Sequence, residues 1–267
     1  MLSKTEIEQI IRDDFFDILQ NETVYKYESF ETAFDKIILG STLMFSNPST
    51  FNDPFDCNEY LLKPQLTDEM VEKALVSLGE NLTTEYKNRL KNNLKDPERI
   101  ASILREEKEQ FKMTCFSRIS DETLMWSHYA DKHNGICIGF KFPIDYQEKF
   151  ILCGVRYESE IKPIDGATDF LRTSLYWLTT KSKRWDYENE VRAITKTIPE
   201  KDRQTIEFDR KHIKEIIFGC NVSQTKIEET IKKINQTELN KNGIEFHKMI
   251  IDKNSFLLKK IPIKPCT

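Results

Sequence analysis

The chain has 267 residues, enough for one large domain or two small ones with a self-supporting core. Hydrophobic residues make up 39% of it, charged residues 31%, and the net charge of −4 gives no sign of the basic face that phosphate-driven nucleic-acid binding needs. No apolar run reaches the ~20 residues that span a bilayer. Residues 1–12 lack the basic and apolar blocks of a signal peptide. We therefore expect a cytoplasmic protein without a membrane partner.

The glycines and cysteines argue against several cofactor sites. None of the eight glycines falls into a P-loop or a Rossmann fingerprint, and none of the six cysteines forms a C-x-x-C pair. Cys115, His128 and His133 resemble half of a zinc finger, but the partner cysteine before Cys115 is missing. We expect no metal site, and we expect the cysteines to act as small buried hydrophobes.

The N-terminal part predicts alternating helices and strands. A capping box at Ser3 precedes apolar residues at helical spacing, and a β-rich segment follows. Ser29 then caps a second helix, which Gly40 ends in the left-handed position typical of a helix C-terminus. We predict a helix over 3–19, a strand over 23–27, a helix over 29–39 and a strand over 42–45.

Two polar stretches follow. Residues 46–56 contain two prolines and are not helical. Residues 67–110 are rich in lysine and glutamate and helical in pattern, with breaks at Gly79 and Pro97. We predict that 67–110 form a helical insertion on the rim of a sheet domain rather than a separate globule.

The remaining chain predicts mostly strands. Asp121 caps one helix, another spans about 167–180, and Ser223 caps a third. Many of the strands lack a helical crossover, so we expect an α+β fold, a single domain over 1–267 with one mixed sheet and the helical insertion. The strands are expected at 112–117, 135–142, 151–157, 190–195, 204–208, 213–218, 245–252 and 256–263.

Two clusters near the N-terminus could carry chemistry. In Tyr25-Lys-Tyr27, strand alternation puts both tyrosines on one face and Lys26 on the other. The alternative is a pair of core aromatics with a solvated lysine. In 51–56, Asn52 and Asp53 lie between two phenylalanines, which is typical of a structural turn and also of a binding loop.

A third cluster covers residues 124–133. On a helix, Trp126, Tyr129 and His133 share one face, which usually faces a core. His128 and His133 account for two of the four histidines of the chain, and this favours a functional interpretation.

The fourth cluster covers residues 181–192. Glu188 and Glu190 are expected to enter a strand on one face, with Arg192 next along it. A surface ladder of glutamate and arginine is one interpretation. The other is a carboxylate at a strand start, held by an arginine and flanked by Trp185 and Tyr187.

These clusters together resemble the bacterial family labelled domain of unknown function 2971, whose name carries no activity. The resemblance covers about residues 22–220. It rests on Tyr25-Lys-Tyr27, Phe51-Asn-Asp-Pro-Phe55, Met125-Trp-Ser-His-Tyr-Ala130, Gly135-Ile-Cys-Ile-Gly-Phe140 and Trp185-Asp-Tyr-Glu-Asn-Glu-Val-Arg192.

The order of elements also resembles the ADP-ribosyltransferase fold, particularly its DNA-modifying toxin branch. An aromatic or basic strand is followed by a helix, a glycine and a short strand, and a glutamate later opens another strand. The histidine that many transferases carry on the first strand is replaced here by Tyr25-Lys-Tyr27. The resemblance implies an ADP-ribosyltransferase-like fold with NAD as the substrate.

What this resemblance implies for single residues agrees with the chemistry of NAD cleavage. The transition state is oxocarbenium-like, so a carboxylate at the ribose stabilises the developing charge, while aromatic rings hold nicotinamide and cations or backbone donors hold the diphosphate. The implied catalytic set is Glu190, Glu188, Tyr129 and His128. The implied NAD-binding set is Tyr25, Lys26, Tyr27, Ser46, Asn52, Asp53, Trp126, Lys181, Trp185 and Arg192.

The leading hypothesis from the sequence is an NAD-dependent ADP-ribosyltransferase or NAD glycohydrolase, whose acceptor is a protein, a nucleic acid or water. Two alternatives stay open. Asp53, Asp56, Glu188 and Glu190 could assemble the carboxylate site of a metal-dependent nuclease. The groups around Asn52 and Trp126 could instead form a non-catalytic module that binds a ligand or a partner.

Overall fold

The computed structural model describes residues 17–62, 96–143, 149–163, 170–196, 203–237 and 243–263, together with residues 69, 83–85, 88–89 and 92. Within them the protein is α+β with a mixed sheet, as the sequence predicts. Residues 3–16 of the predicted helix at 3–19 and most of the predicted insertion at 67–110 lie outside the described residues. The end of that helix is wrong, because Ile18 forms a β-bridge with Cys153 instead. That the chain forms a single domain stays a prediction.

Most of the predicted strands are present, with small shifts of their ends. The strands are β1 (Thr23–Glu28), β2 (Thr42–Ser46), β3 (Phe111–Ser117), β4 (Ile136–Lys141), β5 (Ile151–Gly154), β6 (Arg156–Glu158), β7 (Thr180–Ser182), β8 (Glu190–Lys196), β9 (Arg203–Glu207), β10 (Ile213–Phe218), β11 (Glu245–Ile251) and β12 (Leu258–Pro262).

The described helices are short. They are a π-helix η1 (Thr32–Leu39), short 3₁₀ turns η2 (Pro48–Thr50), η3 (Glu59–Leu61), η5 (Lys183–Glu188) and η6 (Arg210–His212), and α-helices α4 (Pro97–Lys108), α5 (Thr123–Tyr129), α6 (Phe170–Leu178) and α7 (Gln224–Asn235). No described helix is long and apolar enough to cross a bilayer.

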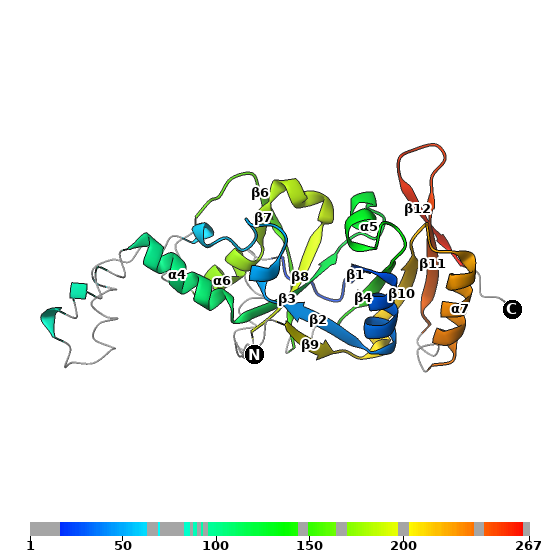
Figure 1. Ribbon diagram of the computed structural model, residues 1–267, viewed down its shortest axis with the longest axis horizontal. Helices are drawn as coiled ribbons and strands as arrows, with labels where there is room; N and C mark the ends of the chain where they lie inside the picture. Colours follow the sequence, from blue (N-terminus) through cyan, green and yellow to red (C-terminus); the bar gives the residue numbers. More distant parts are fainter. Residues whose placement is uncertain are drawn as a thin grey trace.

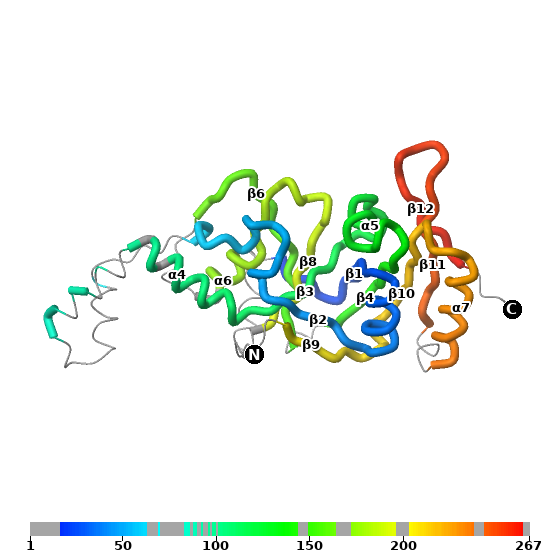
Figure 2. Tube along the Cα trace, in the orientation of Figure 1, coloured from blue at the N-terminus to red at the C-terminus, as the bar shows by residue number. Residues whose placement is uncertain are grey.

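Strands that are far apart in the sequence lie side by side in the main sheet (Figures 1 and 2). The order is β12-β11-β10-β4-β1-β3-β2-β9, and β8 pairs with both β3 and β5. The pair β10–β11 is parallel and the other pairs of this sheet are antiparallel. In Figure 1, α7 accompanies β11 and β12 at one end of the molecule, and α4 and α6 lie at the other end.

Apolar side chains bury both faces of the sheet. On one face, η1 contributes Phe34 and Ile38, and α7 contributes Ile227, to the largest core cluster. On the other, Trp126 of α5 packs edge-on against Tyr27 of β1, with ring centroids 5.3 Å apart. A third cluster joins α6 to β3, β5 and β8. Since burial of apolar surface is the main favourable term in folding, these clusters fix the helices to the sheet.

The sheet is loosely joined at its centre, and this positions the candidate site. β1 and β3 are paired at one position, Tyr25 with Ser117, whereas β1 pairs with β4 and β3 pairs with β8 along their whole lengths. Lys26 reaches from β1 toward β3 and donates a hydrogen bond from Nζ to the carbonyl of Cys115, at 3.1 Å. The β1–β4 and β3–β8 parts of the sheet are therefore each well paired, with an opening between β1 and β3.

The end of the second helix differs from the prediction. Gly40 does not adopt the left-handed conformation: its φ is −79°, and the next residue, Ser41, takes the positive φ of 56° instead. Glycine is needed at this position for space, because a Cβ on it would lie 2.5 Å from the carbonyl oxygen of Lys36.

Four other sequence predictions need correction. Glu122, not Asp121, caps α5 by accepting a hydrogen bond from the backbone N–H of Leu124. His133 does not share the helix face, because α5 ends at Tyr129 and His133 adopts a positive φ of 70° in the following turn. The predicted strand at 151–157 is interrupted between β5 and β6. Glu188 is not on a strand with Glu190, since it ends η5 before the left-handed Asn189.

Candidate functional site

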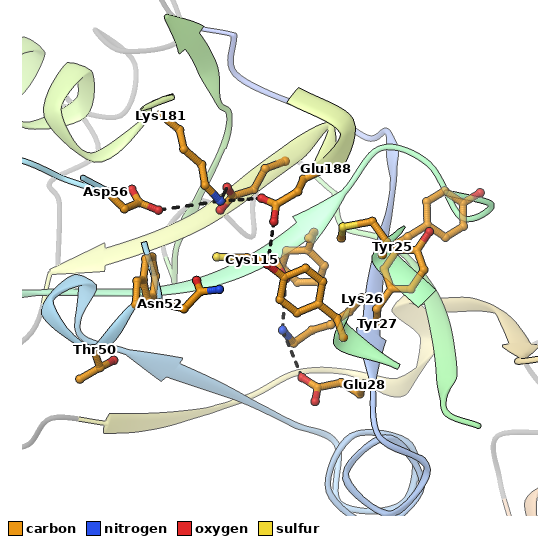
Figure 3. Close-up of a pocket in the computed structure, with 15 residues that line it drawn as sticks. Tyr25, Lys26, Tyr27, Glu28, Thr50, Asn52, Asp56, Cys115, Lys181 and Glu188 are labelled. Carbon is orange, nitrogen blue, oxygen red and sulfur yellow. Dashed lines mark hydrogen bonds and ion pairs between the residues drawn. The ribbon is translucent and has the colours of Figure 1, made fainter. Parts of the chain in front are cut away.

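A cavity of about 330 Å³ opens where β1 and β3 separate (Figure 3). Its size is in the range of small-molecule sites. β1 and β3 supply two walls, the loop after β2 supplies a third, and α5 together with η5 and the start of β8 closes the cavity. The lining residues are Tyr25, Lys26, Tyr27, Glu28, Thr50, Phe51, Asn52, Asp56, Cys115, Phe116, Met125, Tyr129, Lys181, Glu188 and Glu190.

Lys181 gathers three carboxylates at one wall of the cavity (Figure 3). Its Nζ lies 2.5 Å from Glu188 Oε2, 2.9 Å from Glu190 Oε2 and 3.9 Å from Asp56 Oδ2. Charge-assisted hydrogen bonds of this kind are the strong ones, and the site is buried, so the arrangement is held in place. Tyr129 adds a further bond, from its hydroxyl to Glu188 Oε1 at 2.7 Å.

Arg192 holds the other side of this carboxylate group from inside the protein. It is fully buried and donates to both oxygens of Asp56, at 2.8 and 2.6 Å, and to both oxygens of Glu190, at 2.7 and 3.1 Å. Its remaining donor bonds the carbonyl of Leu178. All five guanidinium N–H groups are thus used within the protein, and Arg192 orients Glu190 rather than contacting a ligand.

The two glutamates have opposite protonation tendencies. Burial by itself would raise the pKa of Glu190, but the charges of Arg192 and Lys181 outweigh it and hold this pKa well below its ordinary value. Burial raises the pKa of Glu188 above its ordinary value of 4.5, although Lys181 opposes the effect. A pair of carboxyls with separated pKa values is typical of sites where one group stays ionised and the other exchanges a proton.

The tyrosines of the cavity present rings rather than free hydroxyls. Tyr25 donates its hydroxyl to Glu215, Tyr27 donates to the carbonyl of Ile119, and Tyr129 donates to Glu188. With Phe51 and Phe116, they make the remaining wall largely aromatic. Tyr25 reaches Glu215 across β4, where its neighbour in register is Gly139. A Cβ at this position would lie 2.6 Å from Cγ of Glu215.

The sequence comparison covers one side of this site. Residues 125–193 match the family model of a protein of unknown function, DUF2971. This confirms the resemblance to that family which the motifs indicate. The matched range includes Tyr129, Lys181, Glu188 and Glu190, while the β1 tyrosines and the loop after β2 lie outside it. Neither a curated protein nor a solved structure matches the chain.

Eight of the residues singled out from the sequence line the cavity, and six do not. Those that line it are Tyr25, Lys26, Tyr27, Asn52, Tyr129, Lys181, Glu188 and Glu190. Those that do not are Ser46, Asp53, Trp126, His128, Trp185 and Arg192.

Each of those six lies elsewhere for a visible reason. Trp126 is fully buried and donates its indole N–H to the carbonyl of Ser120, so no ligand can stack on it. His128 is exposed on the outside of α5. Ser46 pairs within the sheet, and buried Asp53 accepts a backbone hydrogen bond in its own turn. Trp185 covers Lys181 from outside, with its ring centroid 4.9 Å from the Lys181 Nζ. Arg192 lies behind Glu190.

Several lining residues were not among the sequence candidates for the NAD site. These are Glu28, Thr50, Phe51, Asp56, Cys115, Phe116 and Met125. Asp56 could have been found from the sequence. Arg192 lies between the apolar residues Val191 and Ala193 of a predicted strand, and a buried arginine needs carboxylate partners. Asp56 belongs to the second cluster, residues 51–56. The other lining residues could not have been found in this way, because a residue type such as phenylalanine or threonine occurs both in protein cores and in cavity walls.

The nuclease alternative is not supported by the arrangement of its carboxylates. Asp56, Glu188 and Glu190 do converge, but Lys181 and Arg192 already occupy the space between them and pair with their oxygens. Asp53, the fourth proposed ligand, does not line the cavity. Among the described residues, no group of three metal-ligating side chains has the geometry of a metal site.

Proposed function

We propose that this protein cleaves the bond between nicotinamide and ribose in NAD and transfers the ADP-ribosyl group to an acceptor or to water. The observation that carries the proposal is the pair of glutamates on Lys181, at the wall of an aromatic cavity that opens between β1 and β3. The fold class and the order of strands support it, because an ADP-ribosyltransferase-like arrangement also opens a late strand with a glutamate.

Glu190 supplies the fixed negative charge. When the C1′–N bond breaks, its electron pair moves to the ring nitrogen, nicotinamide leaves as a neutral base, and the ribose becomes an oxocarbenium-like cation. A carboxylate that is already ionised and already oriented stabilises this charge without rearranging. Glu190 meets both conditions, because Arg192 and Lys181 keep it ionised and fix its oxygens.

Glu188 supplies the exchangeable proton site. Water or an acceptor hydroxyl attacks C1′, and the proton that it loses passes to the Glu188 carboxylate. The raised pKa of Glu188 suits a base, and its hydrogen bond from Tyr129 fixes the carboxyl toward the cavity. In this proposal the Glu188 carboxylate also orients an acceptor hydroxyl, a role that water does not need, so Glu188→Gln is expected to impair transfer to an acceptor more than hydrolysis.

Nicotinamide release tests the proposal directly. The purified protein is incubated with NAD, and free nicotinamide and ADP-ribose are separated and measured over time. Release of both in equal amounts indicates hydrolysis, and release of nicotinamide alone indicates transfer to an acceptor. Saturable NAD binding without any release would favour the non-catalytic ligand-binding module instead.

The pH dependence of turnover gives a second test. A base must be unprotonated to work, so turnover should fall as the pH is lowered through the pKa of Glu188. Because burial raises that pKa above 4.5, the acid limb should lie above this value. Glu190 should stay ionised at every pH of this measurement, from about pH 5 to 9, since its pKa is held well below the ordinary value.

The profile is measured as kcat from about pH 5 to 9, with circular dichroism at each pH to confirm that the fold persists. Glu188→Gln should flatten the acid limb. If the limb survives unchanged in this variant, another group is the base.

A further inference from the structure

The charges around the cavity favour a cationic ligand. The lining residues include the carboxylates Glu28, Asp56, Glu188 and Glu190, against the two cations Lys26 and Lys181, with Arg192 behind them. Four carboxylates against three cations leave one negative charge when all are ionised. A low-dielectric cavity with net negative charge attracts a cation and repels a phosphate.

The lining cations are already paired with carboxylates of the protein, which makes them poor partners for a diphosphate. Lys26 lies 3.3 Å from Glu28 and bonds the carbonyl of Cys115. Lys181 is shared among three carboxylates, and the donors of Arg192 are all used. Recruiting either lysine to a phosphate would leave a buried or half-buried carboxylate without its partner, which is costly.

The aromatic wall suits a flat cation. Tyr25, Tyr27 and Phe116 line the cavity with rings, and the tyrosine hydroxyls are turned to the protein. Faces of aromatic rings attract cations, most strongly where water is excluded. Asn52 adds a neutral polar group: its side chain points toward the cavity in Figure 3, where it could pair with a carboxamide.

We infer that the cavity recognises the cationic pyridinium riboside end of its substrate and needs no diphosphate. Free N-ribosyl pyridinium compounds then belong to the substrate class together with the dinucleotide. This inference rests on the proposed function for the cleavage step and on the cavity alone for recognition. In the cleavage of such a riboside, the C1′–N pair goes to the ring nitrogen, water oxygen bonds C1′, and the water proton goes to Glu188.

Recognition is tested with ligands that cannot react. N-methylnicotinamide carries the pyridinium charge without a ribose, nicotinamide is its neutral counterpart, and ADP-ribose carries the diphosphate without the cation. Calorimetric titration of the wild-type protein should show N-methylnicotinamide binding at least tenfold more tightly than nicotinamide, with ADP-ribose not competing. ADP-ribose binding as tightly as the pyridinium would overturn the inference.

A pair of charge variants on β1 separates electrostatics from structural damage. Glu28→Gln makes the wall one charge more positive and should weaken N-methylnicotinamide binding roughly tenfold. Lys26→Met makes it one charge more negative and should tighten binding. The control is Glu228→Gln on exposed α7, which should leave binding unchanged. If both β1 variants weaken binding alike, the charge argument is wrong.

Cleavage of nicotinamide riboside and of NAD is then compared. We expect kcat/KM values within about tenfold of each other, and a preference for NAD above a hundredfold would overturn the inference while leaving the proposed function intact. Conversely, selective pyridinium binding without cleavage of either compound would refute the proposed function and support the inference about recognition.

Discussion

Glu190→Gln is expected to slow nicotinamide release by on the order of 10²-fold or more, with a much smaller loss of NAD affinity, of about tenfold at most. The substitution keeps the shape of the side chain and removes the charge that faces the developing oxocarbenium. In the ground state the positive charge lies on the pyridinium ring and not on the ribose that Glu190 faces, so binding is affected much less than turnover. Single-turnover release measured at several NAD concentrations separates the two effects.

A stability control is needed because Glu190 is also part of a buried ion group. Its loss leaves Lys181 and Arg192 with one anion fewer, which is expected to lower Tm. Ile227→Ala in the core under α7 is a matched control: it is destabilising by about 2–5 kcal/mol but does not touch the cavity. The control should retain the wild-type rate below its Tm. A Glu190→Gln protein that releases nicotinamide at the wild-type rate would remove Glu190 from the mechanism.

Arg192→Met should give the largest loss of stability in this region, about 3–5 kcal/mol. The methionine fills similar space but leaves Asp56 and Glu190 buried without their shared cation. For a chain of this length, such a loss lowers Tm by roughly 6–20 °C. Differential scanning calorimetry on both proteins measures the change.

Two further variants make the Arg192 result specific. Lys183→Met removes the exposed ion pair with Asp186 and should change stability by no more than about 1 kcal/mol. Adding Asp56→Asn to Arg192→Met removes one of the stranded carboxylates and should recover part of the loss. If Arg192→Met costs no more than Lys183→Met, the buried ion group does not hold the site together.

The sequence was most informative where structure depends on neighbours along the chain. The strand at 190–195 and the strand at 213–218 follow from their β-branched and apolar residues, and both are confirmed. The cap at Ser223 is confirmed because its side chain accepts a hydrogen bond from an N–H three residues later. The predicted cap at Asp121 is wrong by one residue. Glu122 also has a side-chain carboxylate, and it is this residue that accepts the hydrogen bond from the backbone N–H of Leu124.

The candidate site shows the limit of such reasoning. The fourth cluster, residues 181–192, indicated Glu188 and Glu190, and both line the cavity. The prediction that they share one strand face is wrong, because the left-handed Asn189 separates them. They meet because both bond Lys181, which comes from β7, a strand that the pattern did not predict. Trp126 illustrates the reverse case, since its residue type suits a ligand platform and its packing against Tyr27 makes it core.

The sequence by itself determined the α+β class, most of the strands and the residue types available for chemistry, because these depend on periodicity and on local hydrogen bonds. Only the tertiary structure decided which of those residues meet. Asp56 and Arg192 are separated by 136 positions, and β1 and β3 by a long stretch of chain, yet their contacts define the carboxylate group and the cavity. Such pairs form when the free energy gained from burial and charge pairing exceeds the entropic cost of closing long loops. A short segment of sequence does not contain both partners, so it cannot predict the contact.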